Sequence, residues 1–191
     1  IRFRREAWGR FFDDIFAANG SGRVLISDDY HLRQWADGLF ESRSAWIQTL
    51  LFHLEAAEQL SIRTVIKSTI QLCNIGEQAL SINAERIVTA AEMLLSDELS
   101  EAEIAVICSL LGQRGADMRS HVEVTVAAIR GLWEIRALTP VREKVTSIIL
   151  RSLTRFQGDD ARLVVDTVQT QLRDERIIQF IVRWRVGHFL N

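Results

Sequence analysis

Proline is almost absent from this sequence, and this absence constrains the fold more than any other feature. Pro140 is the single proline among 191 residues, and only 10 residues are glycine. These two residue types interrupt helices most often, because proline lacks a backbone N–H and glycine is conformationally free. The chain is therefore predicted to be mainly helical.

Apolar residues recur at helical spacing along most of the chain, and capping residues mark several starts. Asn83 is a predicted N-cap, Ser100 and Glu103 have the spacing of a capping box, and Thr139 precedes Pro140 at a predicted helix start. No repeat of fixed period emerges. The pattern predicts helices around residues 5–18, 30–40, 46–54, 62–70, 84–95, 101–111, 118–136, 140–153 and 163–172, and a last one that reaches Leu190.

Two short segments are predicted to be strands, over residues 23–27 and 78–82. The first is β-branched and apolar, and it lies between a glycine-containing turn and two aspartates. Because both segments lie in the first half, we expect a small α/β part over residues 1–95, in which the two strands run parallel. A helical bundle is then predicted over residues 96–191.

Composition excludes several classes of protein. With 48% apolar residues and a formal net charge of −2, the chain can bury a core and is not a general nucleic-acid coat. No apolar run approaches the ~18 residues that a membrane span needs, and no secretory signal is seen, so a cytoplasmic location is expected. Two cysteines and four scattered histidines predict neither a disulfide framework nor a zinc site.

The strongest candidate for chemistry is Ser27-Asp28-Asp29, directly after the first predicted strand. In open α/β sheets, ligands bind at the carboxyl ends of strands. Carboxylate oxygens are also the ligands that Mg²⁺ and Mn²⁺ prefer. The alternative is structural, because aspartate before a helix is a common N-cap that interacts favourably with the helix dipole. Both interpretations stay open at this point.

The same region resembles PIN domains, a family in which an apolar strand runs into Ser/Thr-x-Asp and then a helix. The resemblance rests on an ordered series of segments: Arg23-Val-Leu-Ile-Ser-Asp-Asp-Tyr-His-Leu-Arg33, Trp46-Ile-Gln-Thr-Leu-Leu51 and Leu80-Ser-Ile-Asn-Ala-Glu85. It covers the C-terminal half of a PIN-like domain, of the type found at the end of large bacterial proteins, including proteins with tetratricopeptide repeats. The family's first strand, with its leading aspartate, is not seen upstream of Arg23.

The resemblance implies a metal-dependent endonuclease that hydrolyses phosphodiesters, RNA more often than DNA, with Mg²⁺ or Mn²⁺ as cofactor. It implies that Asp29 and Asp28 are catalytic and metal-binding acids, that Ser27 orients a carboxylate or a water molecule, and that Glu6 is a further metal ligand. The alternative function is a catalytically inactive helical module that binds other domains or protein partners. The apolar last helix suits either a core or an interface. An upstream strand with an aspartate at its tip, and a further acid before the helix that contains Trp8, would favour the enzyme, and their absence would favour the module.

Overall fold

The computed structural model describes residues 13–20, 22–77 and 80–189. The chain divides into two compact units, Ile1–Ser61 (unit 1) and Ile62–Asn191 (unit 2). The mainly helical fold with a small parallel sheet is confirmed. The division falls after Ser61, between a helix that ends at Ala56 and one that begins at Ile62. The predicted boundary after Leu95 lies inside unit 2. None of the helices in the described residues is long and apolar enough to span a membrane.

Unit 1 is a minimal strand–helix–strand arrangement. After a helical segment at residues 13–18 come β1 (Leu25–Ile26), α2 (Tyr30–Phe40), β2 (Ser44–Ala45) and α3 (Ile47–Ala56). The strands are parallel, with Leu25 opposite Ser44 and Ile26 opposite Ala45. Ile15, Leu25 and Ala36 form a small buried core. Residues 5–12 of the first predicted helix lie outside the described residues.

The prediction of a second strand over residues 78–82 is wrong for residues 80–82, the part that the structure describes. Residues 80–82 form a loop, and residues 78 and 79 lie outside the described residues. Leu80 is buried, as a residue of a buried strand would be, but it lies in a connection that ends at Asn83, the N-cap of the following helix. The strand that pairs with β1 is β2, which directly follows α2.

Unit 2 contains seven α-helices in its described residues, joined by short connections. They are α4 (Ile62–Asn74), α5 (Ala84–Leu95), α6 (Glu101–Cys108), α7 (Met118–Glu134), α8 (Arg142–Thr154), α9 (Ala161–Gln171) and α10 (Glu175–Phe189), with 3₁₀ turns η1 (Arg136–Leu138) and η2 (Gly158–Asp160). The predicted caps at Asn83 and Ser100 are confirmed, and Ser100 and Glu103 form a reciprocal capping box. The helix predicted at Pro140 begins at Arg142 instead, because Thr139 closes η1 by donating its hydroxyl to the Arg136 carbonyl (2.7 Å).

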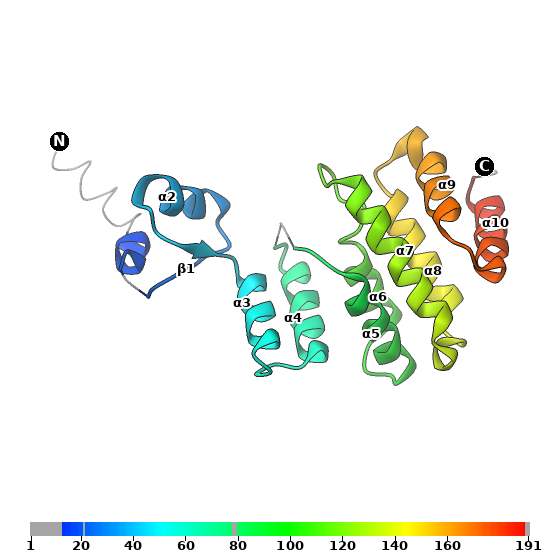
Figure 1. Ribbon diagram of the computed structural model, residues 1–191, viewed down its shortest axis with the longest axis horizontal. Coiled ribbons are helices and arrows are strands. Elements are labelled where there is room, and N and C mark those ends of the chain that lie inside the picture. Colours follow the sequence, from blue (N-terminus) through cyan, green and yellow to red (C-terminus); the bar gives the residue numbers. More distant parts are fainter. Residues whose placement is uncertain (1–12, 21, 78–79, 190–191) are drawn as a thin grey trace. The chain divides into compact units, whose positions relative to one another are not determined.

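The helices of unit 2 are stacked in two layers (Figure 1). One layer contains α4, α6 and α8 in that order, and the other contains α5, α7 and α9. Within each layer, a helix therefore packs against the next but one along the chain. The helices α4, α6 and α8 begin 39 and 41 residues apart, and α5, α7 and α9 begin 34 and 43 residues apart. Stacked helix pairs at intervals near 40 residues are the architecture of an α-solenoid.

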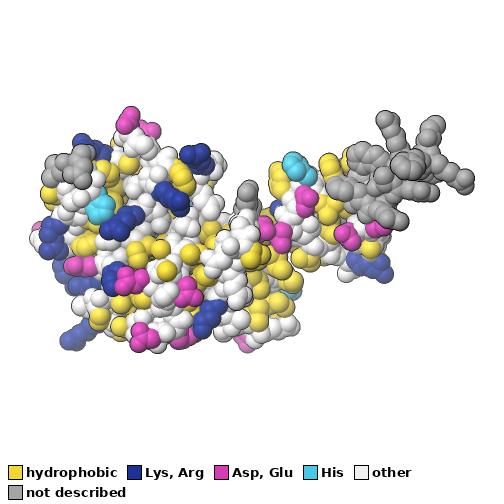
Figure 2. All heavy atoms as spheres, turned by 180° about the vertical axis from the view of Figure 1, so that it is seen from behind, with side chains coloured by type: hydrophobic (Ala, Val, Ile, Leu, Met, Phe, Trp, Pro, Cys, Tyr) yellow, Lys and Arg dark blue, Asp and Glu magenta, His cyan; other side chains and the backbone are white. Residues whose placement is uncertain are grey.

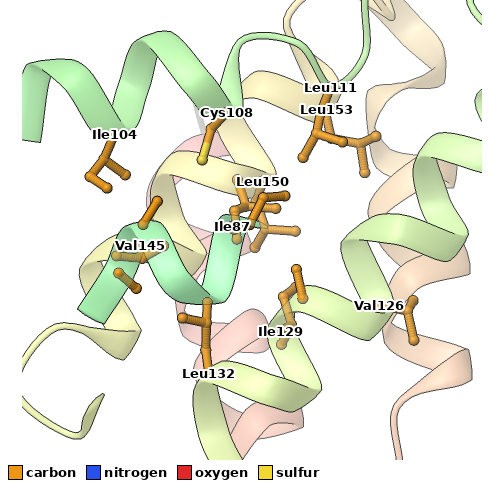
Figure 3. Close-up of a cluster of buried hydrophobic side chains, with 14 of the residues drawn as sticks. Ile87, Ile104, Cys108, Leu111, Val126, Ile129, Leu132, Val145, Leu150 and Leu153 are labelled. Carbon is orange, nitrogen blue, oxygen red and sulfur yellow. The ribbon is translucent and has the colours of Figure 1, made fainter. Parts of the chain in front are cut away.

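One continuous apolar core joins the two layers. Figure 3 shows Ile87 of α5, Ile104 and Cys108 of α6, Ile129 and Leu132 of α7, and Val145 and Leu150 of α8 directed into the same space. Each fully buried Ile or Leu side chain contributes roughly 1.5–3 kcal/mol relative to an exposed one. Gly131 brings α7 close to α5, since a Cβ there would lie 2.8 Å from Val88 Cγ2.

Candidate functional site

Asp29 of the predicted acidic pair is the N-cap of α2. Its Oδ1 accepts a hydrogen bond from the Leu32 backbone N–H at 3.0 Å. The Ser27 hydroxyl oxygen in turn accepts the Asp29 backbone N–H at 3.2 Å. The negative charge lies at the positive end of the helix dipole, which is favourable. The structural interpretation of Asp29 is therefore seen directly in the hydrogen bonds.

Asp28 serves a different helix. Its Oδ1 accepts the Ile47 backbone N–H at 3.2 Å, across 19 residues of sequence. Ile47 is the first residue of α3, and its N-cap, Trp46, has no side-chain acceptor. The aspartate supplies the acceptor that tryptophan cannot, and it links the end of β1 to the start of α3. The two adjacent carboxylates thus stabilise the first turns of two helices.

The same region contains a buried arginine that sequence reasoning did not single out. The Arg33 side chain, in α2, donates from Nη1 to the Ser27 carbonyl oxygen at 2.5 Å. Its guanidinium carbon lies 5.2 Å from the centre of the Trp46 ring and 5.9 Å from that of Tyr30. Arg33 is only 8% exposed. The available sequence signal was its position three residues before Ala36, on the apolar face of α2.

The described residues do not provide the donor set of a PIN-like metal centre. None of their His, Cys, Asp and Glu side chains gather in a group of three or more that could hold a metal ion. Asp28 and Asp29 are each already a hydrogen-bond acceptor at a helix start. Glu6, the third predicted ligand, lies outside the described residues. Mg²⁺ retains most of its water and needs several anionic partners, so this pair alone fits it poorly.

Burial disfavours the reactive thiolate form of both cysteines. Cys108 is fully buried, and burial raises the pKa of its thiol to about 12. Burial also raises the pKa of Cys73. A thiol in such surroundings is seldom ionised, and the thiolate is the reactive form.

The last two helices of unit 2 contain a second candidate surface. A groove there is lined by Arg162, Val182, Arg185, Val186 and Phe189. The apolar last helix, α10, is buried on one face only: Ile177, Phe180, Ile181 and Trp184 are buried, whereas Val182 and Val186 are 44% and 55% exposed. Figure 2 shows that hydrophobic side chains reach the surface of unit 2 between those of Lys and Arg.

The arginines of this groove already have partners in the chain. Arg185 pairs with Asp166, and Arg162 donates to the Phe189 carbonyl oxygen at 2.7 Å. Arg183, on the same helix, lies 3.6 Å from the carboxylate of Glu143. The groove therefore offers mainly apolar surface.

Comparison with protein-family models, with curated proteins and with solved structures finds no match to this chain. The resemblance to PIN domains thus depends only on the segments of sequence quoted above.

Proposed function

We propose that the chain is an interaction module, in which the two-layered stack of unit 2 binds protein partners. The observation that carries this proposal is the stacking of α4, α6 and α8 in one layer and of α5, α7 and α9 in the other. Such stacks present extended surfaces made by many helices, and they are well suited to binding other chains.

The α9–α10 groove is the proposed contact surface. Val182 and Val186 lie one turn apart on α10, are 44% and 55% exposed, and line the groove together with Phe189. Exposed apolar side chains that gather around a groove are typical of protein-binding surfaces. Because the neighbouring arginines are paired within the chain, we propose that the partner contributes the apolar face of a helix.

A photo-crosslinking amino acid at position 186 tests this proposal in cells that express the chain. The matched control places the same amino acid at Ile75, which is 78% exposed in the same unit. The proposal predicts one defined crosslinked protein, another chain or a second copy, from position 186 and none from position 75. Equal or absent crosslinking at both positions would contradict it.

The nuclease hypothesis stays a prediction. It depends on the resemblance around Asp28 and Asp29 and on a contribution from Glu6. Each of the two aspartates uses one carboxylate oxygen, Oδ1, for its helix cap. A carboxylate has about four lone-pair sites, so the caps leave acceptor capacity unused. The interaction module is preferred because it requires only residues that the structure describes.

A further inference from the structure

Unit 1 contains an open pocket of about 550 Å³ between α2, β2 and the start of α3. Aromatic, cationic and polar side chains line it, namely Tyr30, Arg33, Gln34, Asp37, Arg43 and Trp46. Its size lies within the range of small-molecule sites, about 300–1,000 Å³. It uses neither of the capping aspartates.

Two aromatic rings stand at this pocket with much of their surface exposed. Tyr30 is 58% exposed and Trp46 is 38% exposed, although such side chains usually bury most of their area. Each ring has a contact within the unit. The Tyr30 hydroxyl accepts a hydrogen bond from Gln34 Nε2 at 2.7 Å, and the Arg33 guanidinium lies within reach of both ring faces.

The arginine is fixed as firmly as the rings. Its hydrogen bond to the Ser27 carbonyl oxygen attaches it to the end of β1. Rings and guanidinium that are fixed before binding lose little conformational entropy when a flat ligand stacks on them. The pocket is therefore preorganised for a planar group.

The charges of the side chains that line the pocket indicate the charge of its ligand. Arg33 and Arg43 line the pocket with a single acid, Asp37, so cationic groups outnumber anionic ones. We propose that this pocket binds a planar heteroaromatic ring that carries a negative charge, which is the chemistry of a nucleotide, either free or within a single strand. Aromatic side chains and arginine are the usual partners of an unstacked base. This site is separate from the protein-binding groove proposed for unit 2.

The test measures binding of a short fluorescent single-stranded oligouridylate to the full chain by anisotropy, at low salt and with EDTA to prevent any metal-dependent cleavage. Tyr30→Leu and Trp46→Leu are expected to weaken binding about tenfold each, as loss of a stacked ring does. The control is Phe156→Leu, which removes a ring in unit 2 that is 42% exposed and lies 4.9 Å from the Arg155 guanidinium. It should leave binding unchanged.

Competition identifies the source of the ligand. Displacement by free UMP assigns the pocket to mononucleotides, whereas displacement only by unlabelled strand assigns it to single-stranded nucleic acid. Arg43→Gln, at an exposed position, provides a second variant if circular dichroism shows that Trp46→Leu is unfolded. Absence of binding, or equal weakening by Phe156→Leu, would overturn the proposal. Either result leaves the crosslinking test of unit 2 unaffected.

Discussion

Gly112 is predicted to be the least replaceable residue of the connection between α6 and α7. Its φ of +68° is in the left-handed region, and its N–H donates to His121 Nδ1 at 2.7 Å. A Cβ at this position would lie 2.4 Å from the Leu153 carbonyl oxygen and 2.6 Å from that of Ser152. Both are backbone atoms at the end of α8, so no side-chain rotation can relieve the overlap.

The cost of Gly112→Ala has two parts. The left-handed backbone costs an alanine about 1–2 kcal/mol. Separating the connection from α8 by more than half an ångström resembles overpacking of a core, which costs about 1–3 kcal/mol. We therefore expect a loss of about 3 kcal/mol in the free energy of unfolding, a large part of the roughly 5–15 kcal/mol that stabilises a typical domain.

Gly115→Ala is the matched control. Gly115 has a similar φ of +77°, but a Cβ there would meet nothing within 4 Å. Only the backbone cost of about 1–2 kcal/mol applies. The measurement is urea unfolding of both variants, followed by far-ultraviolet circular dichroism. If Gly112→Ala and Gly115→Ala lost the same free energy, the close packing of this connection on α8 would be refuted.

Three further predictions concern single groups of unit 2. Ser100→Ala should cost about 1 kcal/mol in urea unfolding, and an NMR titration should show the pKa of Glu103 rising, because hydrogen bonds from the Ser100 backbone and hydroxyl lower it. Burial lowers the pKa of His121, so the folded state favours the neutral ring that accepts the Gly112 N–H. The stability that the neutral His121 ring gives the folded state should be present above the unfolded pKa of about 6.5 and should fall as pH decreases through the folded pKa. Unfolding curves between neutral and acid pH should show this loss, and His121→Gln should reduce it. Iodoacetamide followed by mass spectrometry should label the half-buried Cys73 before Cys108, whose raised pKa and burial protect it until unfolding; faster labelling of Cys108 would contradict its place in the core.

Local signals made much of the helical structure predictable. The bounds of α2 and the caps at Asn83 and Ser100 follow from side chains within three or four residues of one another. Thr139 and Pro140 predicted a helix start that is not seen there. The Thr139 hydroxyl, which could cap a new helix, instead donates a hydrogen bond to the Arg136 carbonyl oxygen.

Features that depend on distant parts of the chain were not predictable. β2 is two residues long, so it has no alternating pattern, and it is a strand because it lies beside β1. Asp28 caps α3 from 19 residues away, and nothing in the sequence near Asp28 predicts that it accepts the Ile47 N–H. The stacked helices of unit 2 begin at unequal intervals of 39 and 41 residues in one layer and 34 and 43 residues in the other, so a search for a fixed period does not find the repeat.

Asp28 and Asp29 cap helices, and we propose that the chain acts by binding. The most direct measurement incubates the full chain with labelled single-stranded RNA and DNA and Mn²⁺, beside Asp28→Asn and Asp29→Asn. Asparagine is itself a good N-cap, so both variants should stay folded. We expect no cleavage and no rise in melting temperature with Mn²⁺. Metal-dependent cleavage that disappears in a folded Asp29→Asn variant would contradict it and would establish the nuclease.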